Sequence, residues 1–145
     1  MTPADRLALT DLVHRYAAYV DDRQFALAAA LFTDDGVLVV PDPPDCLDPV
    51  ITHPRDSIEA ALGAVPATFH AVVGIVLSDE PPRGRIACVA HHLLRPDLDL
   101  VWHLRYLDSY AQVDGSWRIA RRELHLDLIE TRPVKRSRAM TPRGR

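Results

Sequence analysis

Residues 103–125 restrict what this chain can fold into more than any other segment. Two strand-like runs flank a Val113-Asp114-Gly115-Ser116 turn, and an Asp-Gly pair between such runs is a strong signal for a β-hairpin. The runs are long and follow a helical N-terminal third, so we expect a curved sheet wrapped around helices. Few polar side chains point into such a fold, because burying them is unfavourable. Each inward polar residue is therefore a candidate for chemistry.

Helices and a short strand are predicted before residue 64. Thr2, Pro3 and Asp5 have the pattern of a helix start, and apolar residues at helical spacing continue to Val20. The five prolines from 41 to 54 exclude long regular structure there. We expect a first helix from 3 to 20. A second helix should be capped by Asp22, carry Phe32 on its apolar stripe and end at residues 34–36. A strand at 37–40 and a third helix from about 54 to 63 should follow.

The sequence of the second half of the chain predicts strands. We expect them at 69–78, 84–95, 100–112 and 116–127, separated by turn residues rich in Pro, Asp and Gly. Helices followed by a run of strands indicate an α+β fold with a mostly antiparallel sheet.

Length and composition favour one globular domain. The 145 residues suit a domain at 1–131, followed by a tail at 132–145 with six basic residues and no acidic ones, which we expect to be disordered. A net charge of −3 argues against a nucleic-acid partner, and no apolar run reaches the roughly 18 residues of a membrane span. Cys46 and Cys88 lack metal-site spacing. We expect reduced thiols in a cytoplasmic protein.

Several short motifs occur together in a particular order. Their segments are 16–25 (YAAYVDDRQF), 31–36 (LFTDDG), 68–70 (TFH), 106–108 (YLD) and 114–119 (DGSWRI). In this order they resemble the SnoaL-like branch of the NTF2-like superfamily, which includes scytalone dehydratase-like and bile-acid dehydratase-like enzymes, polyketide cyclases and ketosteroid isomerase relatives. The resemblance implies a cone-shaped sheet around a deep apolar pocket, with no cofactor and no metal. It also implies a small apolar organic substrate and a homodimer or higher homo-oligomer.

The resemblance assigns His70 as the catalytic histidine and Asp21 as the carboxylate that orients it. A histidine is suited to proton transfer at neutral pH, and a carboxylate on one ring nitrogen fixes the tautomer. Asp22 is the rival of Asp21, although capping the second helix would occupy it.

Tyr16 lies five residues before Asp21, where bile-acid dehydratase-like members keep a catalytic tyrosine. It could polarise a substrate carbonyl, and Tyr19 is the substitute if the helix is rotated. Only one of His91 and His92 can face the pocket, because neighbouring strand residues point to opposite faces. Apolarity does not decide between them, and the resemblance favours His91 as a second acid–base group.

Trp102, Leu104, Tyr106 and Asp108 alternate on one face of a strand. The resemblance places them in the pocket as substrate-binding residues. An apolar Leu104 departs from the scytalone dehydratase-like pattern, which argues against that particular substrate. Further predicted positions are Val72 and Val89 as substrate contacts, His103 and Arg105 on the outer face, Trp117 as a packing residue, and Arg121, Arg122 and His125 as outward or rim residues.

The predicted function is a cofactor-independent acid–base enzyme, a dehydratase, isomerase or cyclase, acting on a polyketide- or steroid-like carbonyl compound through His70 and Asp21. One alternative is a non-catalytic NTF2-like module that binds a ligand or dimerises. Another is an epoxide-opening cyclase or hydrolase, which needs a further carboxylate near Asp21; Asp108 is the available candidate.

Overall fold

The chain begins with two helices, as its sequence predicts. The structure, a computed structural model, describes residues 1–42 and 46–138. The predicted capping box begins the first helix: the Asp5 N–H donates to the Thr2 hydroxyl, and the Thr2 N–H donates to the Asp5 carboxylate. The helices are α1 (Pro3–Asp21), α2 (Phe25–Ala29) and α3 (Arg55–Gly63).

Six strands form one sheet, in the order β2-β1-β6-β5-β4-β3. All neighbouring pairs are antiparallel except β1 and β6, which are parallel. The sheet is therefore mixed but mostly antiparallel, and the α+β prediction is confirmed. The strands are β1 (Phe32–Val40), β2 (Ile51–Pro54), β3 (Ala67–Ser78), β4 (Arg83–Arg95), β5 (Leu98–Val113) and β6 (Ser116–Pro133).

The predicted hairpin is formed by β5 and β6. Val113 pairs with Ser116, so Asp114 and Gly115 are the two loop residues. Both have positive φ, 50° and 79°, as a tight turn between twisted strands requires. Glycine adopts this conformation without steric cost, and aspartate tolerates it better than most residues.

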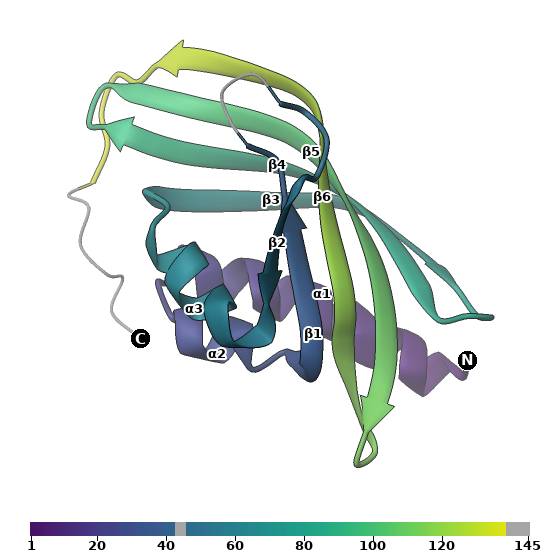
Figure 1. Cartoon of the computed structure of the whole chain (residues 1–145). Helices are drawn as coiled ribbons and strands as arrows, with labels where there is room; N and C mark the ends of the chain where they lie inside the picture. Colours follow the sequence, from purple (N-terminus) through teal and green to yellow (C-terminus); the bar gives the residue numbers. More distant parts are fainter. Residues whose placement is uncertain (43–45, 139–145) are drawn as a thin grey trace.

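Strong curvature turns the sheet into a cone around the helices (Figure 1). The pairing register shifts in β3, in β4 and twice along the β5–β6 pair, and such bulges bend a sheet and increase its twist. One face of α1 packs into the concave side, where Leu9, Val13, Tyr16 and Val20 are buried. The core therefore lies between α1 and the inner face of the sheet.

Two local predictions are wrong, and one short strand was not predicted. The second helix ends at Ala29, and Phe32 already begins β1, so residues 32–36 belong to a strand. Asp22 does not cap α2; it is the C-cap of α1, while Gln24 occupies the N-cap of α2. The proline-rich segment contains a short strand, β2, that pairs with β1. Pairing with an existing strand stabilises a segment whose own composition disfavours regular structure.

The expected boundary at residue 131 falls inside β6, which continues to Pro133. Beyond it, the Val134 N–H donates to the Asp97 carbonyl and the Ser137 hydroxyl donates to the Pro96 carbonyl. This part of the predicted tail is thus tied to the β4–β5 turn. The rest of the tail, 139–145, lies outside the described residues, as do 43–45.

Candidate active site

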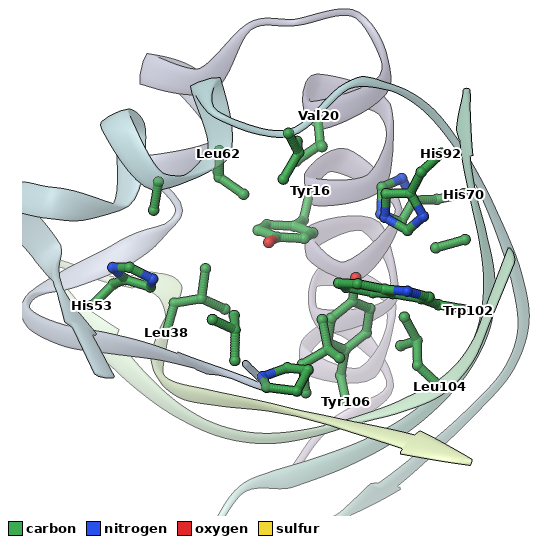
Figure 2. Close-up of a pocket in the computed structure, with 16 residues that line it drawn as sticks. Tyr16, Val20, Leu38, His53, Leu62, His70, His92, Trp102, Leu104 and Tyr106 are labelled. Carbon is green, nitrogen blue, oxygen red and sulfur yellow. The ribbon is translucent and has the colours of Figure 1, made fainter. Parts of the chain in front are cut away.

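A cavity of about 220 Å³ opens between the helices and the concave face of the sheet (Figure 2). Its wall is mainly aliphatic, with side chains such as Val20, Leu38 and Leu62. Among the described residues that line it, six have polar atoms in their side chains: Tyr16, His53, His70, His92, Trp102 and Tyr106. An apolar pocket with a few convergent polar groups is the usual form of a small-molecule site.

His70 and Asp21 form a closely paired dyad at the cavity wall. The His70 Nδ1 atom lies 2.6 Å from Asp21 Oδ1, and the two side chains are only 7% and 13% exposed. The His70 backbone N–H donates to Asp21 Oδ2 at 3.0 Å, and the Thr68 hydroxyl donates to Oδ1 at 2.9 Å. Three donors therefore fix the carboxylate.

The fold brings the dyad together from residues 49 positions apart. Asp21 is the last residue of α1, and α1 packs against β3, which carries Thr68 and His70. Because these two residues alternate along the strand, both face the helix end. Of the two neighbouring aspartates, Asp21 is the one that contacts His70.

This geometry decides which nitrogen of His70 is available. A carboxylate accepts hydrogen bonds, so Nδ1 carries the proton that it donates to Asp21. The remaining nitrogen of the cavity-lining ring, Nε2, is then unprotonated in the neutral imidazole and can accept a proton. When it does, the adjacent carboxylate stabilises the imidazolium.

His92, not His91, lines the cavity, so the prediction that His91 faces it is wrong. His92 pairs with Thr68 across β3 and β4 and therefore shares the inner face with His70. His91 pairs with Phe69, which is 51% exposed, and its Nδ1 atom lies 2.6 Å from Asp99 on the outer face.

His92 offers the cavity a hydrogen-bond acceptor. Its Nδ1 lies 3.1 Å from the Leu100 carbonyl oxygen, and a carbonyl only accepts, so Nδ1 is protonated. Burial lowers the pKa of His92, which keeps the ring neutral at neutral pH and leaves Nε2 as an acceptor. Trp102 packs against this ring with centroids 4.5 Å apart and restricts its orientation.

Two buried tyrosines supply the donors. Burial raises the pKa of Tyr16 to about 12 and raises that of Tyr106 well above its usual value. Both phenols therefore keep their protons at neutral pH and can donate hydrogen bonds. Their rings meet edge to face, with centroids 5.9 Å apart, and the Tyr16 hydroxyl points into the cavity (Figure 2).

Arg122 lies beneath these tyrosines and is completely buried, so its prediction as an outward or rim residue is wrong. Its guanidinium carbon lies 4.3 Å from the Tyr16 ring centroid and 4.2 Å from that of Tyr106. The Asp108 carboxylate accepts two hydrogen bonds from the Arg122 guanidinium, at 2.8 and 2.7 Å. It also accepts a hydrogen bond from the Tyr110 hydroxyl at 2.7 Å. Burial alone would lower the pKa of Arg122, but Asp108 raises it above its usual value.

Comparisons with known proteins identify the family. The family model of the SnoaL-like domain matches residues 2–123. The chain belongs to the SnoaL-like family. No curated protein gives a significant sequence match.

Solved structures resemble this SnoaL-like chain over nearly its whole length. A scytalone dehydratase candidate from Novosphingobium aromaticivorans is 25% identical, with a TM-score of 0.72 over 98% of this chain and 95% of that one. The Kfla4162 protein from Kribbella flavida is also 25% identical, with a TM-score of 0.71 over 88% and 93%. The hexachlorocyclohexane dehydrochlorinase LinA-type3 from Novosphingobium barchaimii is 16% identical, with a TM-score of 0.75 over 91% of each chain, and shows the shared fold.

The SnoaL-like domain does not bring every predicted residue to the cavity. The predicted residues that line it are Tyr16, His70, Trp102, Leu104 and Tyr106. Asp21 does not line it but contacts His70, which does. The other predicted residues that do not line it are Tyr19, Val72, Val89, His91 and Asp108. Tyr19 and Val72 pack against the core, and Val89 is paired with His103 on the outer face.

Sequence reasoning missed two features of the site. The buried Arg122 was detectable in part, because it alternates with the inward Leu124 and Leu126 along β6. His53 had no comparable signal, since the sequence of its segment predicts irregular structure.

In the described part of the chain no cluster of three or more potential metal ligands occurs, and no helix is long and apolar enough to cross a membrane.

Proposed function

We propose that this protein is a cofactor-independent acid–base enzyme that removes a proton next to a carbonyl group of a compact apolar substrate. The observation that carries the proposal is the 2.6 Å contact between His70 Nδ1 and Asp21 in the wall of an apolar cavity. It leaves the Nε2 atom of His70 as a base in a space suited to an apolar molecule. A positioned base typically contributes about 10²–10⁴-fold to a rate.

The other polar residues take complementary roles. Tyr16 and Tyr106 donate hydrogen bonds to the carbonyl oxygen as negative charge develops on it, and one such donor contributes about 3 kcal/mol. His92 accepts a hydrogen bond from a substrate hydroxyl. Asp21 is a positioning residue, because it acts on the substrate only through His70.

Cavity size narrows the substrate class. About 220 Å³ lies below the roughly 300–1,000 Å³ of drug-sized ligand sites. This space favours a carbonyl compound of one or two fused rings over a four-ring steroid. A polyketide-like aromatic or bicyclic ketone therefore fits the proposal better than a steroid does.

The relatives support elimination as the step that follows proton removal. One similar structure is described as a scytalone dehydratase candidate and another as a dehydrochlorinase, and both names denote loss of a small molecule across a carbon–carbon bond. We propose dehydration as the main reaction class, with isomerisation and cyclisation as the variants that share its first step.

The epoxide-opening alternative needs a second carboxylate in the cavity, and its candidate, Asp108, is not there. Asp108 is occupied by Arg122 and Tyr110 beneath the tyrosines and does not line the cavity. The non-catalytic alternative differs from our proposal in one measurable respect: a binding module holds a ketone without exchanging its protons.

Exchange of the α-protons of 2-tetralone, an apolar bicyclic ketone, tests the proposal. In D₂O the wild-type protein should accelerate exchange, measured by proton NMR, and His70→Gln should lower the enzymatic rate by about 10²-fold or more. His103→Gln, on the outer face, is the matched control and should exchange at the wild-type rate. Equal rates for wild type and His70→Gln would contradict the proposal.

Location and assembly belong to the same proposal. We propose a cytoplasmic homodimer. The two cysteines of the described residues are free thiols, as suits a reducing compartment. Exposed apolar side chains on β3, Phe69, Val73 and Val76, offer a face for a second copy.

A further inference from the structure

A third histidine, His53, lines the cavity on the side opposite His70 (Figure 2). His53 belongs to β2 and His70 to β3, the two edge strands of the six-stranded sheet. Curvature of the sheet brings these edges to opposite sides of one small cavity. The two imidazoles therefore approach a bound molecule from different walls.

The inward orientation of His53 follows from its pairing. It lies opposite Leu38 in the β1–β2 pair, and directly paired residues project from the same face. Leu38 is 2% exposed and lines the cavity. Within β2, His53 is half-buried while its three neighbours are exposed. The strand thus turns one side chain toward the cavity.

His53 differs from the other two cavity histidines in its hydrogen bonding. His70 uses Nδ1 for Asp21, and His92 uses Nδ1 for the Leu100 carbonyl. Within residues 1–42 and 46–138, no group is hydrogen bonded to the His53 ring. Neither ring nitrogen is therefore engaged by the described part of the chain, and an imidazole with a free nitrogen can donate a proton and later regain it.

The proposed elimination needs such a group. His70 is the proton acceptor, and neutral His92 presents only an acceptor nitrogen to the cavity. The tyrosines donate to the carbonyl oxygen and remain protonated. A departing hydroxyl oxygen still requires a proton, because hydroxide is a poor leaving group in an apolar cavity.

We propose that His53 is the general acid of the reaction: it donates a hydrogen bond, and then a proton, to the leaving oxygen. This inference rests on the proposed function. The carbon–hydrogen bond breaks as its proton moves to His70 Nε2, and its electron pair forms the new carbon–carbon double bond. The carbon–oxygen bond breaks with its pair moving to oxygen, which takes the proton of the His53 imidazolium and leaves as water. His70 then loses a proton to solvent and His53 regains one.

Placement on opposite walls also predicts the stereochemistry. A base on one side of the substrate and an acid on the other favour departure of the proton and the hydroxyl from opposite faces. The elimination is therefore anti. A donor adjacent to His70 would instead favour departure from the same face.

Ring opening of benzisoxazoles tests the role of His53 separately from that of His70. In this reaction a base removes the carbon-bound proton, the nitrogen–oxygen bond breaks, and its electrons form a phenolate and a nitrile. The leaving phenolate is weakly basic in 5-nitrobenzisoxazole and more basic in unsubstituted benzisoxazole. A general acid therefore accelerates the second compound more than the first, whereas a residue that only supports the structure affects both equally.

The variants are His53→Gln and His53→Asn, with His103→Gln as control and thermal unfolding as the check of folding. We expect the His53 variants to lower kcat/KM by about 10²-fold for benzisoxazole and far less for 5-nitrobenzisoxazole. His70→Gln should lower kcat/KM for both compounds. If the His53 variants lower kcat/KM equally for both compounds, or for neither, while His70→Gln abolishes turnover, the His53 assignment is wrong. The assignment of His70 as the base is then unaffected. If His70→Gln has no effect, or wild type is no faster than free imidazole, the proposed function itself fails.

Discussion

Arg122 and Asp108 form a fully buried ion pair across β5 and β6, with both side chains 0% exposed. The pair underlies the cavity, since the guanidinium contacts the rings of both Tyr16 and Tyr106. A buried charge is tolerated only with a well-placed partner. The pair therefore fixes the position of the two phenols that we assign to the substrate carbonyl.

Asp108→Asn should destabilise the fold severely. It leaves the Arg122 guanidinium buried without its counter-charge, which costs about 3–5 kcal/mol. Asp127→Asn is the matched control, because the Arg105–Asp127 pair is 45% exposed on both sides and should change stability by at most about 1 kcal/mol. Urea unfolding measures both variants. Equal losses would show that the buried pair has no special role.

Tyr16→Phe should reduce activity without loss of stability. The ring that packs against Phe32 and Tyr106 remains, while the hydroxyl in the cavity is removed. Loss of one donor to a developing oxyanion lowers kcat by about 10²–10³-fold. The 2-tetralone exchange assay measures this effect. A Tyr16→Phe protein that exchanges at the wild-type rate would remove Tyr16 from the mechanism.

Asp21→Asn should inactivate the base while keeping most of the site. An amide can donate its own N–H to Nδ1, which favours the tautomer with the proton on Nε2, where it blocks proton abstraction. We expect an exchange rate about 10²–10⁴-fold lower. Thr68→Val is the control, because it removes one hydrogen bond to Asp21 but leaves the 2.6 Å contact with His70. A larger defect in Thr68→Val than in Asp21→Asn would argue against this role of Asp21.

His92 should make stability fall as the solution becomes acidic. Burial lowers its folded-state pKa below the ordinary value of 6.5. As pH falls through about 6.5, the unfolded chain therefore binds a proton that the folded protein does not. The unfolding free energy of wild type should thus decline below this pH, by at most about 1.4 kcal/mol per pH unit from this group. His92→Gln should show a shallower decline in urea unfolding between about pH 7 and pH 5, and an unchanged slope would contradict the buried neutral ring.

The hairpin and the first helix were accessible from local sequence, whereas the contact between Asp21 and His70 was expected only from the family resemblance. The Arg122–Asp108 pair was not accessible from either, for a reason of register. Counting back from the Asp114-Gly115 turn places Asp108 opposite Arg121, but a bulge between Ser109 and Tyr110 shifts the pairing so that Arg122 lies opposite. A shift of one residue exchanges inner and outer faces.

The two adjacent histidines illustrate a second limit. Alternation shows that one of His91 and His92 faces inward, but both faces of β4 carry apolar residues, so the pattern does not choose between them. The choice depends on which of them shares a face with Thr68 and His70, and cross-strand pairing places His92 there. His53 was inaccessible for a different reason, since β2 exists only through its pairing with β1.

Chemical rescue by imidazole tests whether the His70 side chain is the base that removes the substrate proton. His70→Ala removes the proposed base and leaves a space next to the Asp21 carboxylate for a free imidazole. We expect His70→Ala to lose 2-tetralone exchange and added imidazole to restore it in a saturable manner, whereas imidazole should not restore exchange in Asp21→Asn/His70→Ala. Undiminished exchange in His70→Ala without imidazole would contradict the assignment of His70 as the base.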